Sequence, residues 1–528
     1  MIRSHSNSDL PRRLYTAQHV RALDQLMMEH IPITSLQLMR GAASFILATV
    51  LQRWPQLRHL VVFVGTGNNG GDGFYLALLA AAEGISVQVL ECGSSEHLSA
   101  DASSGRRDAQ AAGVSCKPFD PQQDPLSTES SLATVLVDAM LGTGFKGELR
   151  KPYAEAIDWI NGSGLPVLSV DIPSGLSCDT GQVMSTAIRA TMTVCLVGLK
   201  QGLLTAQGPD HCGEILFHDL GMPDFVKQSP VAMTPSCTRI DIHTISGKLA
   251  PRLQSTHKGQ CGNVLVVGGD LAYGGAALLA AEAAARIGAG TVSLLTRPAH
   301  VMAALARRPE IMVRGIDGPD GYSVEQLLDL LERATVVVIG PGLGCSDWGR
   351  SLLQQVLRYA GSTLPVVLDA DALNLLADER VGEDLPPCNA RQWVLTPHPG
   401  EAARLLRSSV AQVQADRFAA VASLRSRWGG AVVLKGAGSL LCSLSEEGAA
   451  VLELCTEGNP GMATGGMGDV LSGVIGGLLA QGLSLANALR CGVCIHGEAA
   501  DLAVAQEGER GLLATDVLPY IRRLANPR

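Results

Sequence analysis

Short, unbroken runs of Val, Leu and Ile recur along this chain, and most of them end at a glycine or an aspartate. In the first half they are HLVVFVG, ISVQVLE, TVLVDAM, PVLSVDI, TMTVCLVG and EILFHDL, and in the second GNVLVVGGD, TVSLLT, ATVVVIGPGLG, LPVVLDA, QWVLTPHPGE and AVVLKGAGS. Apolar runs of this length that do not alternate with polar residues are typical of strands buried on both faces of a parallel sheet. Helical patterns lie between several of them, for example over residues 74–83 and 153–161. The sequence therefore predicts an α/β protein.

The chain has 528 residues, which favours two large domains or three smaller ones. After a helical opening over residues 16–54, the first half is expected to form a Rossmann-like, three-layer domain. Beyond Lys227 the apolar pattern loosens in KQSPVAMTPSCTRID, and then α/β alternation resumes. We therefore expect domains over residues 1–228 and 241–528, joined by a linker at 229–240.

Composition excludes several classes of function. The net charge is −9 and the isoelectric point is near 5.8, so a basic face for nucleic acid is not expected. The start, MIRSHSNSDLPRR, lacks the apolar core of a signal peptide, and no apolar span of ~20 residues suggests a membrane helix. The thirteen cysteines follow no framework spacing, which fits a reducing cytoplasm, and we interpret the CxxC at Cys491–Cys494 as buried helix packing.

The stretch GTGNNGGDG, residues 65–73, follows a predicted strand and precedes a helix. Backbone N–H groups at such a turn can bind an anion, and we interpret the glycines as allowing positive φ and close ligand approach. A glycine-rich loop alone is also compatible with a tight strand–helix turn. The order Asn-Asn-Gly-Gly-Asp is more specific, because carboxamide oxygens can ligate a hard cation and carboxamide nitrogens can hold phosphate.

Three more loops with polar residues fall at strand ends in the same half. Asp138 ends VLVD and precedes AMLGTGFKGE, Asp171 opens DIPSG, and VGLKQGLL follows the next strand. In open α/β sheets, ligands bind beyond the carboxyl ends of the strands. One aspartate after a strand is often only a helix cap. Three such loops at one edge predict a binding site, and Asp171 is the best-placed carboxylate for acid/base chemistry.

Together these motifs resemble the NAD(P)HX epimerase domain, the YjeF N-terminal family, over about residues 14–224. The resemblance implies interconversion of the R and S forms of hydrated NADH and NADPH. It implies substrate contacts at Asn68, Asn69, Gly70, Gly71, Asp72, Gly142, Thr143, Gly144, Phe145, Lys146, Gly147, Glu148 and Asp171. It also implies a potassium ion on Asn69, Asp138 and Ser174, whose oxygens are hard ligands. Whether the ring opens or water leaves and returns during inversion stays open.

The strongest chemical signal of the second half is NPGMATGGMGDVLSG. Gly465, Gly466 and Gly468 precede Asp469 at the start of an apolar helix, where free N–H groups form an anion hole. An aspartate beside that hole can remove a hydroxyl proton while the hole holds a transferring phosphoryl group. Upstream, KGAGS at residues 435–439 is expected at a strand end, in contact with a nucleotide.

This half resembles the ribokinase-like fold, and specifically the NAD(P)HX dehydratase family, over about residues 255–525. HKGQCGNVLVVGG, IGPGLG, DADALN, TPHPGE, KGAGS and NPGMATGGMGD carry the resemblance. It implies that the C6 hydroxyl of the S form is phosphorylated by ADP with Mg²⁺, giving AMP, and that phosphate is then eliminated. The implied substrate contacts are Ala276, Gly342 or Gly344, His398 and Asp469, with Asp469 as base; the implied nucleotide contacts are Lys435, Gly436, Ala437, Gly438, Ser439 and Gly468.

Three functions compete at this point. The first is a bifunctional repair enzyme, a homo-oligomer acting on NADHX and NADPHX. The second is an ATP-dependent kinase of small alcohols with an N-terminal binding module; TPHPGE argues against it, since many such kinases carry Asn where this chain has His398. The third treats the first half as a scaffold. Asn69, Asp138, Asp171 and Ser174 argue against it, because a scaffold has no chemical need for them.

Overall fold

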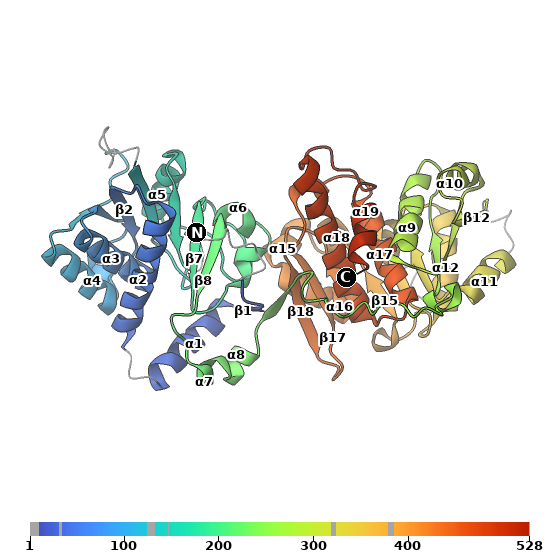
Figure 1. The fold of residues 1–528 in the computed structure, drawn as a ribbon, viewed down its shortest axis with the longest axis horizontal. Helices are drawn as coiled ribbons and strands as arrows, with labels where there is room; N and C mark the ends of the chain where they lie inside the picture. The colour runs from blue at the N-terminus through green and yellow to red at the C-terminus, as the bar shows by residue number, and fades with distance from the viewer. Residues whose placement is uncertain are drawn as a thin grey trace. The chain divides into compact units, whose positions relative to one another are not determined.

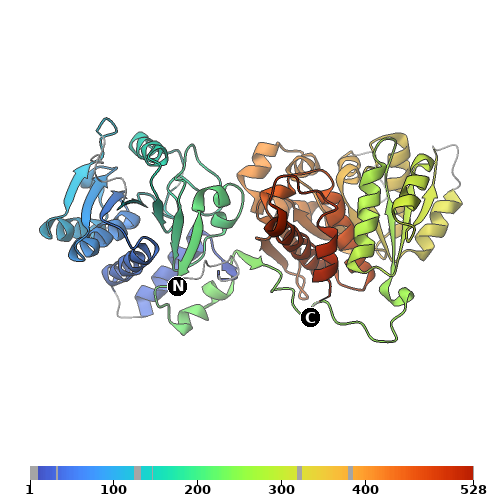
Figure 2. The same ribbon diagram turned by 45° about the horizontal axis from the view of Figure 1, so that its top comes forward.

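The computed structural model describes residues 10–30, 34–123, 133–145, 147–317, 324–378 and 385–526. The chain divides into two compact units, residues 1–239 and 240–528. The first is coloured blue to green in Figure 1 and the second green to red, and Figure 2 shows the same ribbon turned by 45°. Each unit has a sheet with helices packed on it, so the α/β class predicted from the apolar runs is confirmed.

The sheet of the first unit is parallel, with the strand order β4-β3-β2-β5-β6-β7-β8. Its strands are β2 His59–Val64, β3 Ser86–Glu91, β4 Ser115–Pro118, β5 Thr134–Ala139, β6 Val167–Val170, β7 Met192–Leu196 and β8 Glu214–His218. All were predicted except β4, a largely exposed edge strand without an apolar run. The chain order reverses between β2 and β5. The crevice beyond the carboxyl ends of these two strands is where open sheets bind ligands.

Helices cover both faces of this sheet, as a three-layer domain requires. One face is covered by four helices: α1 Ala17–His30, α2 Ser35–Arg53, α3 Asn68–Ala82 and α4 Ala100–Ala111. The other face is covered by α5 Lys151–Gly162. Alternate residues of β2 divide between the two cores: Val62 packs with the first group of helices and Phe63 with α5. This double burial explains why the strand is apolar throughout.

Residues 229–240, expected as a linker, contain regular structure. After α6 Gly208–Cys212 and α7 Asp224–Lys227, the helix α8 Pro230–Met233 is capped by the side chain of Ser229. Strand β9 Cys237–Ile240 pairs antiparallel with β1 Arg13–Leu14. Pro230, which interrupts the apolar pattern, stands at the first turn of α8, where proline is well tolerated.

The sheet of the second unit runs β18-β17-β16-β15-β14-β13-β10-β11-β12. Its strands are β10 Asn263–Val267, β11 Thr291–Thr296, β12 Met312–Gly315, β13 Val336–Ile339, β14 Val366–Leu368, β15 Trp393–Leu395, β16 Ala431–Leu434, β17 Ser439–Leu444 and β18 Ala450–Cys455. Strands from β12 to β16 in this order are parallel, whereas β17 and β18 are antiparallel. Sequence patterns missed β12, β17 and β18, which lie toward the ends of this order.

Small residues let α9 Gly274–Ile287 and α17 Met467–Ala480 pack closely. A β-carbon on Gly473 would lie 2.1 Å from Ala280 O, and one on Gly477 would lie 2.3 Å from Ile287 Cγ2. Protein interiors leave no space for such atoms. The small side chains of the Ala-rich helix are therefore structural, as the sequence indicated.

The remaining helices of this unit complete the layers. They are α10 Val301–Arg307, α11 Val324–Arg333, α12 Asp347–Ala360, α13 Ala370–Leu376, α14 Pro399–Leu406, α15 Val410–Ala415, α16 Arg417–Trp428, α18 Leu485–Glu507 and α19 Leu518–Leu524. Cys491 and Cys494 are buried on α18, which confirms helix packing, and all thirteen cysteines are free thiols. Among the described residues, no helix combines the length and apolarity that crossing a membrane would need.

Candidate active sites

The glycines of residues 65–73 make room for the chain's own backbone. A β-carbon on Gly65 would lie 1.8 Å from Met140 O, and one on Gly70 would lie 2.1 Å from Gly65 O. Asn68 already begins α3, so much of the predicted loop is helical. No glycine of this fully described stretch has a positive φ, and the expectation that they supply left-handed backbone is wrong. Glycine is needed because β2, the loop after β5 and the first turn of α3 meet too closely for side chains.

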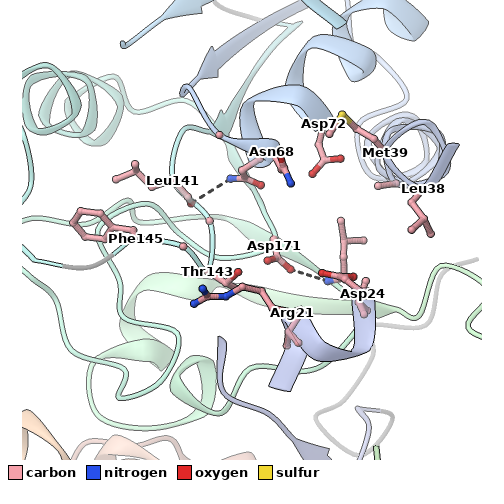
Figure 3. A pocket seen from close by; sticks show the side chains of 18 of the residues that line it. Arg21, Asp24, Leu38, Met39, Asn68, Asp72, Leu141, Thr143, Phe145 and Asp171 are labelled. Atoms are coloured by element: carbon pink, nitrogen blue, oxygen red, sulfur yellow. Dashed lines mark hydrogen bonds between the residues drawn. The ribbon is translucent and has the colours of Figure 1, made fainter. Parts of the chain in front are cut away.

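A cavity of about 520 Å³ opens beside this turn (Figure 3). It takes residues from α1 and α2, from the start of α3, and from the loops after β5, β6 and β7. Ten of its lining residues are labelled in Figure 3: Arg21, Asp24, Leu38, Met39, Asn68, Asp72, Leu141, Thr143, Phe145 and Asp171. A volume of this size lies in the range of small-molecule and cofactor sites.

Asp171 is fixed at the wall of this cavity by its backbone and by an ion pair. Its φ is 69°, a left-handed conformation that costs a residue other than glycine about 1–3 kcal/mol. Its carboxylate accepts hydrogen bonds from Leu196 N, at 3.0 Å, and from Lys200 Nζ. Burial lowers the pKa of the inaccessible Lys200, but the Asp171 charge outweighs this and raises that pKa above its ordinary value. Lys200 is therefore positively charged near neutral pH.

Two more carboxyl groups, Asp24 and Asp72, line the same cavity. Burial raises the pKa of Asp24 to about 6, while the charge of Lys200 opposes this shift. Burial and the charge of Asp171 also raise the pKa of Asp72 well above its ordinary value. The cavity thus combines one ion pair with two carboxyl groups whose pKa values are raised by burial.

Asp138, at the end of β5, is fully buried behind the cavity. Its carboxylate accepts hydrogen bonds from Ser169 Oγ, at 2.9 Å, and from Ser174 N and Oγ, at 2.8 and 2.5 Å. Burial raises the pKa of Asp138, and these hydrogen bonds partly offset the shift. Within the described chain, no Lys, Arg or His side chain forms an ion pair with it. Asn69 lies close by, donating from Nδ2 to Leu141 O at 3.2 Å.

In the second unit, α17 begins at the predicted glycine-rich turn. Gly466 caps the helix with φ 91°, and Asp469 lies in the first turn. A β-carbon on Gly468 would lie 3.2 Å from Lys435 Nζ and 3.9 Å from Asp369 Oδ2, so this glycine keeps the helix start open toward both charges. Burial raises the pKa of Asp469 to about 7, and the charge of Asp369 adds to the shift. Asp469 can therefore accept a proton near neutral pH.

Lys435 joins the carboxyl groups of this second site. Its Nζ donates to Asp369 Oδ1 at 3.0 Å and lies 3.9 Å from Glu401 Oε2. Thr396 Oγ1 donates to the same Asp369 oxygen at 2.7 Å, whereas the buried Asp369 Oδ2 has no hydrogen-bond partner among the described residues. Burial raises the pKa of Glu401 to about 7. An unsatisfied buried carboxylate oxygen indicates a missing cationic or donor ligand.

His398 caps α14 at the site where many kinases carry asparagine. Its Nδ1 accepts a hydrogen bond from Gly400 N at 2.9 Å, and its backbone N–H donates to Glu401 Oε2 at 2.8 Å. Burial lowers the pKa of His398, so the imidazole is neutral at physiological pH. The side chain is about half exposed, so a substrate could reach it, as the predicted contact requires.

Residues 435–439 form the turn between β16 and β17, at the strand end where a nucleotide contact was predicted. Gly436 and Gly438 have φ of 145° and 61°. The buried guanidinium of Arg417 donates to Leu434 O at 3.2 Å and to Ala437 O, which shapes the turn from beneath. Burial lowers the pKa of Arg417 to about 10.

The other predicted substrate contacts lie at the same edge of the sheet. Gly342, after β13, has φ 59°, and its β-carbon would lie 3.2 Å from the Ala276 side chain at the start of α9. Gly344 has φ 69° and donates its N–H to Asp371 Oδ2 at 2.9 Å. Gly342 thus adjoins Ala276, whereas Gly344 contacts the first turn of α13.

The family described as the YjeF-related protein N-terminus matches residues 35–202, and the family described as NAD(P)H-hydrate dehydratase matches residues 264–523. A bifunctional NAD(P)H-hydrate repair enzyme of Coxiella burnetii is 44% identical over 97% of this chain and 99% of its own. The one of Vibrio cholerae is 40% identical over 98% and 99%. The chain belongs to the bifunctional NAD(P)H-hydrate repair enzymes.

A solved structure of an ADP/ATP-dependent NAD(P)H-hydrate dehydratase from Bacillus subtilis, co-crystallised with ATP and Mg²⁺, is also similar. It is 28% identical and covers 54% of this chain and 95% of that chain, with a TM-score of 0.46. The predicted family and the prediction of a bifunctional repair enzyme are confirmed. We call residues 1–239 the epimerase unit and residues 240–528 the dehydratase unit.

Most residues predicted to contact substrate in the epimerase unit line its cavity. These are Asn68, Asn69, Asp72, Gly142, Thr143, Gly144, Phe145 and Asp171. Gly70 and Gly71 pack into the protein, while Gly147 and Glu148 are exposed and outside the lining. Lys146 lies outside the described residues.

Four residues of the two sites were missed from the sequence. Lys200 lies in VGLKQGLL, a loop noted for its position without a role for the lysine, and Asp369 opens DADALN. Asp24 lies on the amphipathic helix α1, where an acidic residue gives no signal of a site. Arg417 gives no comparable signal, because only the fold brings it under residues 435–439.

Proposed function

We propose that the two sites act in succession on one damaged coenzyme. The epimerase unit interconverts the R and S forms of NADHX and NADPHX, and the dehydratase unit returns the S form to NADH or NADPH. One observation carries the proposal: a chain that matches bifunctional repair enzymes over nearly its whole length holds two separate clusters of carboxyl groups, each organised by one lysine. The domain limits proposed are 1–228 and 241–528, with a junction at 229–240.

In the epimerase unit, Asp171 is proposed as the acid/base residue. Its carboxylate faces the cavity, and Lys200 and Leu196 N hold it in one orientation. Residues 68–72, 142–148 and Asp171 are proposed to bind the substrate. Inversion at C6 requires proton transfer to and from oxygen, which a fixed carboxylate can perform.

Asn69, Asp138 and Ser174 are proposed to hold K⁺ in this unit. Amide, carboxylate and hydroxyl oxygens suit a hard cation, and the buried Asp138 has no cationic side chain paired with it in the described chain. A bound K⁺ would supply the balancing positive charge. Replacing K⁺ by a large organic cation in the buffer should lower the epimerisation rate, and added K⁺ should restore it; a rate indifferent to K⁺ would contradict the assignment.

In the dehydratase unit, Asp469 is proposed to take the proton of the C6 hydroxyl as that oxygen attacks the terminal phosphoryl group of the nucleotide. Ala276, Gly342 or Gly344, and His398 are proposed to position the substrate. Phosphate then leaves with the electron pair of the C6–O bond, assisted by the N1 lone pair, and a proton is lost from C5. Phosphorylation matters because hydroxide is a poor leaving group.

Lys435, Gly436, Ala437, Gly438, Ser439 and Gly468 are proposed to contact the nucleotide, and we propose ADP as the donor. Asp369 and Glu401 would hold Mg²⁺, which fits the unsatisfied Asp369 Oδ2. The metal would supply charge neutralisation at the phosphates. Initial rates with ADP and with ATP at equal concentration test the donor, and a preference for ATP would contradict it.

We further propose a homo-oligomer working in the cytoplasm. The thirteen free thiols suit a reducing compartment. Size-exclusion chromatography with light scattering tests the oligomer, and a monomeric mass at working concentration would contradict it.

One assay tests the function as a whole. Purified protein is mixed with epimeric NADHX, Mg²⁺ and ADP, and the absorbance of regenerated NADH is followed. Conversion beyond the S fraction, faster than spontaneous epimerisation allows, is the expected result. A stop at the S fraction would remove the epimerase activity, and accumulation of a stable phosphorylated product would instead indicate a kinase.

A further inference from the structure

The epimerase cavity is lined by two carboxyl groups besides the one in its ion pair. Lys200 pairs with Asp171, but neither Asp24 nor Asp72 has a hydrogen-bond or ion-pair partner among the described residues. Arg21 also reaches the cavity, yet its guanidinium donates to Ala17 O of its own helix. Three ionised carboxylates beside one ammonium repel one another, so the cavity favours a state in which one carboxyl keeps its proton.

Asp24 is the member of this group that lies next to the reactive pair. It comes from α1, whose residues Val20, Asp24 and Met28 line the cavity at a spacing of four, on one face of the helix. Figure 3 shows its carboxyl and that of Asp171 directed into the same space, with Asp72 reaching in from α3. The charge of Lys200 acts on both Asp24 and Asp171. Two carboxyls, one paired and one unpaired, thus face the same space.

We propose that Asp24 is a second catalytic residue of the epimerase, the proton-carrying partner of Asp171. This rests on the epimerase site proposed above. The Asp171 carboxylate takes the proton of the C6 hydroxyl, and the C6–N1 bond breaks. Its electron pair passes to N1 while C6 becomes an aldehyde carbon, and protonated Asp24 gives its proton to N1.

Closure reverses these transfers. Rotation about the C5–C6 bond turns the other face of the aldehyde toward N1, whose electron pair re-forms the ring. Asp24 takes back the N1 proton, and Asp171 returns its proton to the oxygen. Two carriers are needed because the oxygen and N1 change protons in opposite directions in one step. Both residues regain their starting states, and only the configuration at C6 has changed.

The ion pair explains why the two roles differ. Lys200 and Leu196 N donate hydrogen bonds to the Asp171 carboxylate and hold it in place to accept a proton. Asp24 lacks such donors, and burial favours its protonated form against the opposing charge of Lys200, which suits an acid. The pKa of about 6 that burial gives Asp24 allows it to release and regain a proton near neutral pH.

The test compares Asp24→Asn with Glu29→Gln, an exposed carboxyl of the same helix, in the full chain. Conversion of R-NADHX to the S form is followed by chromatography without nucleotide, so that dehydration does not occur. Asp24→Asn should lower kcat by about 10²–10⁴, with circular dichroism, and S-NADHX dehydration when ADP is supplied, unchanged. Added formate should restore activity to Asp24→Ala, since a small acid can replace a missing carboxyl but not a structural contact.

A kcat of Asp24→Asn within threefold of Glu29→Gln would overturn the proposal, as would a loss in Asp24→Ala that formate does not recover. The ring-opening step has its own test in H₂¹⁸O, where the oxygen at C6 should be retained during inversion; one ¹⁸O gained per inversion would overturn that step. Asp171→Asn separates the two levels. If it abolishes epimerisation while Asp24→Asn does not, only this inference fails; if neither variant matters, the proposed epimerase site fails.

Discussion

The two sites of this chain share a plan and differ in what surrounds it. Each places three carboxyls and one lysine at the carboxyl edge of a sheet: Asp24, Asp72 and Asp171 with Lys200 in the epimerase unit, and Asp369, Glu401 and Asp469 with Lys435 in the dehydratase unit. In the first, β-carbons added to Gly65 and Gly70 would collide with backbone oxygens. In the second, Gly468 leaves the start of α17 open toward the charges.

This difference follows the chemistry that each unit has to perform. Inverting the carbinol carbon by opening and closing the ring exchanges only protons with the enzyme, so carboxyl groups beside the substrate suffice. Transferring a phosphoryl group brings in several negative charges, which require free N–H groups and cations. Within the described residues, the unit proposed to handle phosphate combines a helix start that is open toward two charged groups with the unsatisfied Asp369 Oδ2. Glycine-rich strand–helix turns therefore serve two purposes here, packing in one unit and ligand access in the other.

Asp469→Asn should give the largest effect. It removes the proposed base, so S-NADHX dehydration should fall toward the upper end of about 10²–10⁴. Epimerisation should not change, because the epimerase cavity includes no residue of the other unit. NADH formation from the S epimer and chromatography of the epimers measure the two activities separately. A parallel fall of both in a folded variant would break the comparison.

Lys200→Met, in the epimerase site, should give the next largest effect. The side chain of Lys200 is inaccessible to solvent, and its loss leaves Asp171 without its cation. Breaking a buried ion pair costs about 3–5 kcal/mol, so the epimerase unit should unfold at lower denaturant concentration and lose most of its activity. The control is Lys151→Met, whose side chain is 84% exposed in its pair with Glu155. Equal stability of the two variants would contradict the role of the Lys200 pair.

The pH dependence of dehydration should follow Asp469. As a base it acts in its ionised form, and its pKa is about 7. The dehydration rate should therefore rise with pH up to about 7 and fall roughly tenfold for each unit below it. Rate measurements on S-NADHX at saturating ADP check this, with the residual activity of Asp469→Asn as the reference. A wild-type profile flat between pH 5 and 8 would exclude Asp469 as the titrating base.

Gly65→Ala should give a smaller effect, on stability alone. Its β-carbon would meet Met140 O at 1.8 Å, and overpacking of this kind costs about 1–3 kcal/mol. The matched control is Gly67→Ala in the same loop, where nothing lies within 4 Å of the added atom. Chemical denaturation of both variants gives the difference. If the two proved equally stable, the packing role of this turn would be wrong.

Local patterns predicted most of the fold because burial on both faces makes a strand apolar along its whole length. Strand β2 is readable for that reason, whereas β4, with the sequence SCKP, lies at an edge and carries no such signal. The glycines of residues 65–73 showed the opposite limit. Their number indicated a tight turn, but the atom that excludes a side chain, Met140 O, is distant in sequence and only the fold reveals it.

Site residues could be predicted from the sequence where they directly follow a strand or begin a helix. Asp171 and Asp469 follow from their place after a strand or at a helix start. Asp24 could not be assigned, because an acid on an amphipathic helix is ordinarily a solvated one and only the cavity shows otherwise. Arg417 donates to three carbonyls at the β16–β17 turn, and no local sequence pattern predicts these contacts.

The central claim is that one polypeptide carries two independent sites working on the same substrate in turn. Mixing two full-length variants tests it most directly: Asp171→Asn, with an intact dehydratase site, and Asp469→Asn, with an intact epimerase site. Neither alone should convert R-NADHX to NADH faster than spontaneous epimerisation permits. The mixture, given ADP and Mg²⁺, should convert it completely at a rate near that of the unaltered enzyme. A mixture no faster than its separate components would contradict the account.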